Sequence, residues 1–263
     1  MPRKRKLVPD SDDKGQNSRI SKTPTVEHQD GKGDACFAVS KYFGDEKMKP
    51  FRLGPDFFNQ PCIGLAKSFL GQILVRKLPD GRELRGRIVE TEAYLGGEDE
   101  ASHSANGKRT GRNVAMFMPA GTMYVYQIYG IYFCLNISSQ GEGAAVLLRS
   151  LEPLQGLDTM RHLRNLRRKE KGKALKDWEL CNGPSKLCQA LAINKSFDRR
   201  DLASDGEAWL ERGPDVLTAQ AVVAAARIGI NYAGEWARKP LRFYIKGNKC
   251  VSVVDKAVER EAL

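Results

Sequence analysis

The sequence lacks the features that would indicate a membrane protein, a secreted protein or a metalloprotein. No apolar run approaches the roughly 20 residues that a membrane-spanning helix needs. The basic N-terminus is not followed by an apolar segment, so we expect no secretion signal. Six cysteines are scattered without a C-x-x-C pair, and there are only three histidines. We therefore expect reduced thiols, no structural metal and, without a glycine-rich phosphate loop, no cofactor.

Positive charge, in contrast, is abundant along the chain. The 263 residues include 43 Lys and Arg against 32 Asp and Glu, which gives a net charge of +11. Residues 1–50 hold eleven basic and eight acidic side chains, so +8 of the charge belongs to residues 51–263. A basic domain favours a polyanionic partner, either nucleic acid or an anionic membrane surface. We favour nucleic acid, because nothing in the sequence indicates a membrane.

The first fifty residues differ from the rest. They are polar, and residues 9–25 have no sustained apolar period, so we predict that 1–50 is a disordered tail. Its cluster Pro2–Lys6 is typical of nuclear import signals, although a solvated charge run is an equal alternative. Residues 51–263 have the size of one domain. We expect a nuclear protein, of which a part could also reach mitochondria, and a tail that could recruit partner proteins.

Hydrophobic periodicity in residues 51–263 predicts a mixture of hairpins and helices. A helix is expected to begin at Pro55, with apolar spacing that continues to Phe69. Further helices are expected around residues 157–163 and from Pro184 onward. Predicted strands are 72–78, 84–94, 122–128, 132–138, 144–151, 241–246 and 251–255, whereas 221–230 is ambiguous between strand and helix. Neighbouring strands joined by short turns favour an α+β fold over repeated βαβ units.

Two polar side chains are candidates for chemistry at the end of strand 84–94. Strand alternation places Ile88, Glu90 and Glu92 on one face, so Glu92 shares a partly apolar face next to a loop. A carboxylate that loses solvent there can act as a base toward water, although a partly exposed acid is the commoner outcome. His103 follows eleven positions later and could hydrogen-bond a base edge, or simply lie at the surface.

The hairpin 122–138 carries an aromatic tip. Tyr129, Ile131 and Tyr132 surround Gly130 at a turn where polar residues are normal, so the tip needs either core packing or an external partner. Proteins that kink DNA push apolar wedges between base steps. The same hairpin carries Tyr124, Tyr126 and Asn136, which with Tyr94 could form a slot for a flat heterocycle or belong to the core.

Several charged residues need partners. Arg149 interrupts an apolar run and requires a counter-charge if it is buried, for which Glu92 is one candidate. The run 161–176 contains eight Lys and Arg and one acid, and is either a solvated loop or a phosphate contact. Lys186 lies just inside the helix that begins at Pro184, where free N–H groups attract anions.

Four stretches together resemble one protein family. RGRIVETEAYLG (85–96), NVAMFMPAGTMYVYQIYGIYFCLNISS (113–139), GPSKLCQALAI (183–193) and EWARKPLRFY (235–244) are similar to the alkyladenine (N-methylpurine) DNA glycosylases of vertebrates. The similarity runs from about Phe51 to Asp255. It implies a single mixed domain with a curved antiparallel sheet, a protruding hairpin, surrounding helices and no metal. It also implies a monomeric, monofunctional glycosylase of base excision repair that acts on damaged purines in double-stranded DNA.

The resemblance further implies roles for individual residues. Glu92 would activate the attacking water, with Arg149 beside it and the backbone carbonyl of Ile228 helping to hold that water. The base pocket would consist of Tyr94, His103, Tyr126 and Asn136, the last excluding guanine through its amino group. Tyr129 would fill the vacated stack with Ile131 and Tyr132 beside it. The residues expected at phosphates are Lys108, Thr110, Arg112 and Lys186.

Such an enzyme must extrude its target, because the duplex hides the glycosidic carbon. Bond cleavage develops positive charge on the sugar, which an anionic Glu92 would stabilise. Aromatic faces favour cationic alkylated purines, while neutral hypoxanthine and ethenoadenine would gain more from acid assistance. The alternatives are a non-catalytic damage-sensing DNA-binding protein and an RNA-modifying or formyltransferase-type enzyme.

Overall fold

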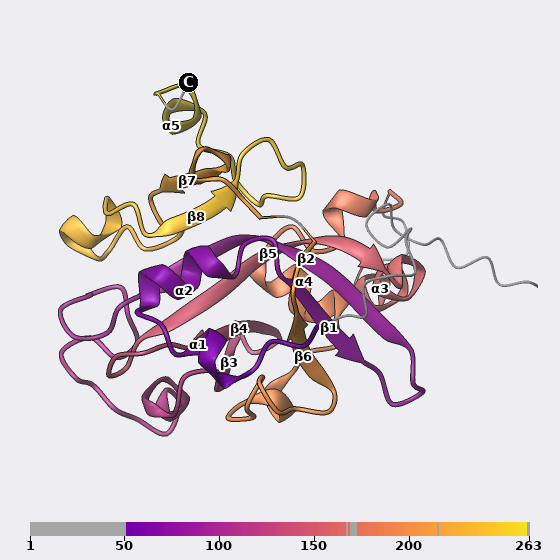
Figure 1. The fold of residues 1–263 in the computed structure, drawn as a ribbon, viewed down its shortest axis with the longest axis horizontal. Coiled ribbons are helices and arrows are strands. Elements are labelled where there is room, and N and C mark those ends of the chain that lie inside the picture. Colours follow the sequence, from indigo (N-terminus) through magenta and orange to yellow (C-terminus); the bar gives the residue numbers. More distant parts are fainter. Residues whose placement is uncertain (1–50, 167, 169–172, 215, 262–263) are drawn as a thin grey trace, which may run out of the picture. The chain divides into compact units, whose positions relative to one another are not determined.

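A long antiparallel strand pair forms the centre of the fold. In the computed structural model, which describes residues 51–166, 168, 173–214 and 216–261, strands β2 (Glu83–Tyr94) and β5 (Ala145–Gln155) run side by side through the molecule (Figure 1). β2 is buried along nearly its whole length, because elements cover both of its faces. The predicted tail 1–50, and residues 167 and 169–172 of the basic run 161–176, lie outside the described residues.

Six further strands complete the sheet, and every ladder is antiparallel. The order is β3-β4-β5-β2-β1-β6, with β8 also paired to β2 and β7 paired to β8. Their bounds are β1 Ile73–Lys77, β3 Met123–Ile128, β4 Tyr132–Ser138, β6 Ala208–Glu211, β7 Val222–Ala225 and β8 Arg242–Ile245. One edge of β2 is thus shared: β1 pairs with residues 83–87, and β8 pairs with residues 90–92.

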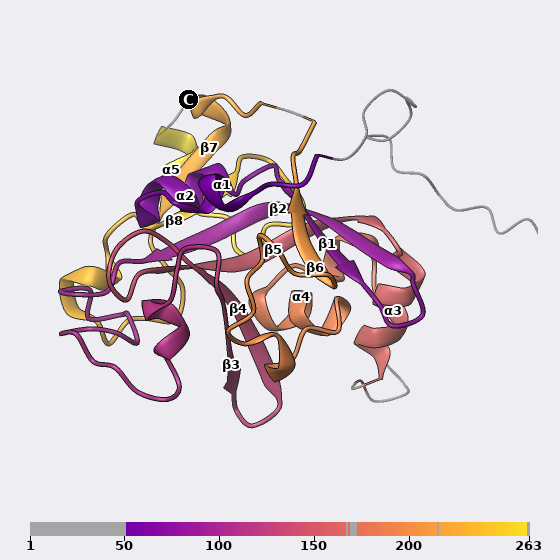
Figure 2. The ribbon, with the colours of Figure 1, turned by 60° about the horizontal axis from the view of Figure 1, so that its bottom comes forward.

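Helices cover the two faces of the β2–β5 pair. Figure 2 shows α1 (Pro55–Phe58) and α2 (Cys62–Ser68) on one face, with α3 (Leu157–Asn165) and α4 (Pro184–Ala190) on the other. A short helix, α5 (Lys256–Glu261), follows β8. Buried aliphatic and aromatic side chains from both layers form one main core, which includes Phe58, Phe69, Ile88 and Leu148. The α+β class expected from the sequence is confirmed.

The hairpin formed by β3 and β4 projects from the sheet (Figure 2). Its register pairs Tyr124 with Asn136 and Ile128 with Tyr132, and β4 joins the rest of the sheet only through residues 136–138. The hairpin tip is therefore free of other strands. Both predicted hairpins, this one and β1–β2, are confirmed.

Three expectations about secondary structure were wrong. The helix expected from Pro55 to Phe69 is two helices, because Pro61 lacks the N–H that a continuous helix needs and takes an extended conformation. The strand expected to end at Leu151 continues through Pro153 to Gln155, since a register shift beside Gly86 accommodates the proline. The strand expected at 251–255 is irregular.

Some further elements were not predicted from the sequence, and one stretch had been ambiguous. β6, α5 and the short 3₁₀ segments were not predicted from the sequence. The ambiguous stretch 221–230 contains β7 and then a loop, and this loop reaches the site described next. Among the described residues, no helix combines the length and the apolar character needed to cross a bilayer.

Candidate active site

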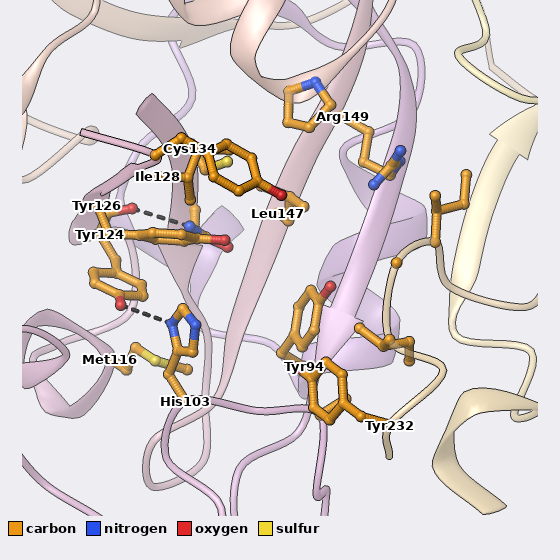
Figure 3. Close-up of a pocket in the computed structure, with 17 residues that line it drawn as sticks. Tyr94, His103, Met116, Tyr124, Tyr126, Ile128, Cys134, Leu147, Arg149 and Tyr232 are labelled. Carbon is orange, nitrogen blue, oxygen red and sulfur yellow. Dashed lines mark hydrogen bonds between the residues drawn. The ribbon is translucent and has the colours of Figure 1, made fainter. Parts of the chain in front are cut away.

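A cavity of about 250 Å³ opens between the β3–β4 hairpin and the end of β2. Its lining combines aromatic and polar side chains with aliphatic ones: Tyr94, Ala101, His103, Met116, Tyr124, Tyr126, Ile128, Tyr129, Cys134, Asn136, Leu147, Arg149, Pro184, Ile228, Gly229, Ile230 and Tyr232. Figure 3 shows His103, Tyr124 and Tyr126 on one side and Tyr94 with Arg149 across from them. Pockets for drug-sized ligands measure roughly 300–1,000 Å³, so this cavity suits one small flat ring system.

Glu92 lies directly behind the wall of this cavity. Its side chain is fully buried, and its two oxygens are held by different partners. The hydroxyl of Tyr94 donates to Oε2 at 2.9 Å, and the backbone N–H of Ile228 donates to Oε1 at 2.8 Å. All of these partners line the cavity, so the carboxylate is one side chain away from its interior. An ionised carboxylate has about four lone-pair positions and can still accept from a water there.

Arg149 joins Glu92 to a second buried carboxylate. Its guanidinium lies 3.2 Å from Oε1 of Glu92 and 3.3 Å from Oε1 of Glu90, and its side chain is only 8% exposed. Arg149 has no partner in the β2–β5 register, because the pairing passes from Ser150 to Leu148. A bulge of this kind turns a side chain away from its regular direction. Here it brings Arg149 between the two glutamates.

Glu90 is the more heavily bonded of the two acids. It accepts hydrogen bonds from Arg149, Arg242, the hydroxyl of Ser150 and the backbone N–H of Ser252. Burial by itself would raise the pKa of Glu90, but the attraction of Arg149 and these hydrogen bonds outweigh it and lower the pKa. Glu90 is therefore ionised, and it anchors the arginine that touches Glu92.

The opposite wall of the cavity is an aromatic cluster. The ring of His103 meets that of Tyr126 edge-on at a centroid distance of 4.7 Å, and its Nδ1 is 2.9 Å from the hydroxyl of Tyr124. Loss of solvent contact, together with Arg112 and Lys108, lowers the pKa of His103 to about 4. The imidazole is thus neutral at physiological pH. Asn136 is buried beside this cluster and donates to the carbonyl of Tyr124.

The hairpin tip stands at the rim of the cavity. Tyr129 is 88% exposed and has a φ of 50°, and Gly130 follows with a φ of 70°. With a hydrogen bond from the N–H of Ile131 to the carbonyl of Ile128, this is the backbone pattern of a type I′ turn. Asparagine and glycine usually occupy its centre, so a tyrosine there is strained as well as exposed. Ile131 is also exposed, at 51%, whereas Tyr132 is half-buried.

The four residues expected at phosphates are exposed and adjoin the cavity. Arg112 lies over the ring of Tyr126 at 5.0 Å, and Lys108 and Thr110 precede it on the same loop. Lys186 is two residues after the cavity-lining Pro184 and donates to the side chain of Asn182. In the described part of the run 161–176, by contrast, Arg164 is buried and donates to the carbonyl of Leu180. Arg164 therefore links α3 to the segment before α4 and is turned away from solvent.

A second buried ion pair at the site was not predicted from the sequence. Arg227 and Asp99 are both fully buried and bonded twice, at 2.7 Å each. The guanidinium of Arg227 lies 4.7 Å from the centre of the Tyr94 ring. Tyr232, 73% exposed at the mouth of the cavity, was also missed. No local pattern marks these residues, because Asp99 and Arg227 are 128 positions apart.

The described residues contain no group of three or more His, Cys, Asp and Glu side chains placed to hold a metal ion. The cavity itself presents a buried carboxylate beside a cluster of aromatic rings. This combination can bind a flat heterocycle and direct a water toward an atom attached to it.

Comparisons with known proteins agree with this description. A family model described as "Methylpurine-DNA glycosylase (MPG)" matches residues 56–249. The chain is 66% identical over 223 residues to a DNA-3-methyladenine glycosylase of Homo sapiens, covering 84% of this chain and 75% of that protein. It is 50% identical over 195 residues to a probable DNA-3-methyladenine glycosylase of Encephalitozoon cuniculi, covering 74% and 89%. It is 44% identical over 203 residues to a putative 3-methyladenine DNA glycosylase of Clostridium perfringens, covering 76% and 98%.

Proposed function

Because the chain belongs to the methylpurine-DNA glycosylase family, we propose that its cavity receives a damaged purine turned out of duplex DNA and that Glu92 activates the water that releases it. Membership of this family makes the protein an N-glycosyl hydrolase of DNA repair. The single observation that carries the proposal is the position of Glu92. It is buried, held at both oxygens by residues of the cavity wall, and faced across the cavity by aromatic rings.

The reaction needs a group that accepts a proton from water and a negative charge near the sugar, and one carboxylate can supply both. As the bond between C1′ and the purine nitrogen breaks, the base takes the electron pair and positive charge develops on the sugar. Ionised Glu92 stabilises this charge and accepts a proton from the water whose oxygen bonds to C1′. Arg149 and the N–H of Ile228 hold the carboxylate in position. A purine that already carries an alkyl group and a positive charge leaves as a neutral base.

The cavity walls account for recognition of the base. Tyr94 and Tyr126 offer ring faces from two sides of the cavity, which favour electron-poor purines. If the Tyr124 hydroxyl donates to Nδ1 of His103, Nε2 carries the hydrogen and can donate to the base edge. We infer that Asn136, which is buried beside the cavity, excludes guanine by a clash with its exocyclic amino group. Alkylated adenine and guanine, hypoxanthine and ethenoadenine are the substrates we infer.

The rim supplies the contacts to the duplex. Exposed Tyr129 would enter the stack that the base vacates, with Ile131 and Tyr132 beside it. Lys108, Thr110, Arg112 and Lys186 would bind phosphates. We further infer a nuclear enzyme that acts as a monomer on double-stranded DNA, with repair partners recruited by residues 1–50.

Release of bases from a lesion panel tests this function. The full chain, in excess over duplexes containing methylated adenine, hypoxanthine or ethenoadenine, should release the damaged base and leave an intact strand with an abasic site. Matched RNA duplexes should stay unchanged. Binding to the damaged duplex without any base release would favour a damage sensor, and base release confined to RNA would favour an RNA-modifying enzyme. A borohydride-trapped covalent adduct would contradict a monofunctional mechanism.

A further inference from the structure

We propose that Asp99 determines how strongly the cavity prefers positively charged bases over neutral ones, by neutralising the arginine stacked behind Tyr94. The inference rests on the proposed function, since it requires a base stacked on the cavity face of Tyr94. It concerns a residue that neither lines the cavity nor touches Glu92.

The geometry begins with the two faces of the Tyr94 ring. Tyr94 lines the cavity, whereas Arg227, 4.7 Å from the ring centre, does not. Arg227 is also fully buried, so it covers the ring face that is turned away from the cavity. A base in the cavity and the guanidinium of Arg227 would therefore lie on opposite sides of the same ring.

Asp99 is built into this position by backbone contacts. Its Oδ2 accepts from the N–H of Leu95 at 2.9 Å, and its Oδ1 accepts from the N–H of Ala101 at 3.2 Å. Both oxygens also accept hydrogen bonds from the guanidinium of Arg227, which in addition donates to the carbonyl of Ala93. The ion pair thus ties the end of β2, the loop that carries His103 and the loop that carries Ile228. It can neither swing away nor exchange with solvent.

The electrostatic consequence follows from the charges on the two sides of the ring. A lone cation behind an aromatic ring weakens the attraction between that ring and a second cation in front of it, because both draw on the same π electrons. It also repels the second cation directly, and burial leaves this repulsion poorly screened. With Asp99 ionised, the unit behind Tyr94 is neutral. The ring is then available to a cationic base, while a neutral base is little affected either way.

Substitution of Asp99 by asparagine tests the effect of the negative charge of Asp99 separately from its size and shape. Asn keeps the size of the side chain and can accept from a backbone N–H, but it leaves the charge of Arg227 uncompensated. We expect Asp99→Asn to lower the excision of cationic methylated adenines relative to neutral hypoxanthine by roughly tenfold, the change that a unit charge about 8 Å away gives at intermediate permittivity. The double variant Asp99→Asn with Arg227→Met removes both charges and should return the ratio to near the wild-type value.

The assay is an internal competition. A dimethyl sulfate-treated dA·dT duplex and a hypoxanthine duplex are mixed in one reaction, and the released bases are separated by chromatography and corrected for uncatalysed loss. The ratio of the two products does not depend on the fraction of enzyme that is folded, so loss of stability alone cannot move it. Should Asp99→Asn fail to fold, Arg227→Met serves instead. It leaves only a negative charge behind the ring, and its ratio should rise or stay the same.

A second stack in the same protein provides the control. Arg200 lies over Phe197 at 4.4 Å and is bonded to Asp205, with 2.7 Å between its Nη2 and Oδ1 of Asp205, but Phe197 does not line the cavity. Asp205→Asn should therefore leave the ratio unchanged. Equal loss of both products in Asp99→Asn, or a falling ratio in Arg227→Met, would overturn the inference. A wild-type protein that releases neither base would instead refute the proposed function itself.

Discussion

Replacement of Arg149 by methionine tests whether this one arginine compensates the buried charges of both glutamates on β2, and so stabilises the fold. Methionine keeps most of the length of the side chain and removes its charge. Arg149 is 8% exposed and contacts Glu90, Glu92 and the hydroxyl of Ser252. Removal of one partner from a buried ion pair costs about 3–5 kcal/mol, because it leaves the other charge uncompensated. Arg242 still reaches Glu90 at 2.9 Å, so we expect the lower end, about 3 kcal/mol.

The pH dependence gives this prediction a second test. Arg149 is the largest attraction that holds the pKa of Glu90 below its ordinary value of 4.5. A lowered pKa contributes stability that is present above the ordinary pKa and is lost as the pH falls through the pKa of the folded state. The stability difference between wild type and Arg149→Met should therefore be largest near pH 7. It should narrow toward acid pH, because Glu90 in the variant takes up a proton at a higher pH than Glu90 in the wild type does.

Urea unfolding at several pH values measures this difference directly. At pH 7 we expect a loss of about 3 kcal/mol, which corresponds to a fall of about 6–12 °C in Tm for a domain of this size. Arg161→Met is the matched control, because Arg161 pairs with the exposed Asp158 and Asp177 at the surface. Its cost should stay below about 1 kcal/mol. An Arg149→Met protein as stable as that control at pH 7 would refute the reasoning.

Three further predictions concern the rim and the base pocket. Tyr129→Asn should leave the Tm unchanged or slightly higher, because asparagine tolerates a φ of 50° better, while single-turnover excision falls; unchanged excision would remove Tyr129 from the flipping step. In NMR titrations His103 should protonate near pH 4, so its stabilising contribution as a neutral ring is present above the ordinary pKa of 6.5 and is lost as the pH falls through about 4; a midpoint at or above 6.5 would contradict the described environment. Lys108→Ala should reduce the slope of log affinity against log salt concentration by about 1. The control is Lys77→Ala, which should leave this slope unchanged, because Lys77 on β1 pairs with Glu83 at the end of β2 that is far from Tyr94. Equal slopes for the two variants would refute the phosphate contact.

The hairpins could be predicted from the sequence because their information is local. In β3–β4 the aromatic and β-branched residues alternate on both sides of a short turn, and the ladder pairs Ile128 with Tyr132 as the pattern implies. The tip was recognisable as unusual because aromatic residues stand where polar ones are normal, but the sequence left core packing and exposure as alternatives; Tyr129 is 88% exposed. The elements that could be predicted were therefore those whose paired strands follow each other closely in the sequence.

The pairing of Arg149 with Glu92 was predicted as one candidate and is confirmed. The other buried charge pairs could not be predicted, because their partners come from distant parts of the chain. Glu90 receives Arg242 from β8, 152 positions away, and Arg227 finds Asp99 across 128 positions. A charged residue in an apolar stretch shows that a partner is needed, but not which one. Alternation along β2 indicated that Glu90 and Glu92 share a side, and Arg149 does contact both. The register shift that brings Arg149 between them is a property of the paired strands and has no local signature.

Glu92→Gln, assayed for both binding and base release, is the most direct test of the account. Glutamine preserves the shape of the side chain and can still accept from the Tyr94 hydroxyl, but it can neither take up the proton of a water nor stabilise a cationic sugar. We expect the variant to bind a hypoxanthine or ethenoadenine duplex about as tightly as the wild type does, and its base release to be abolished. Release at a rate near that of the wild type would contradict this expectation.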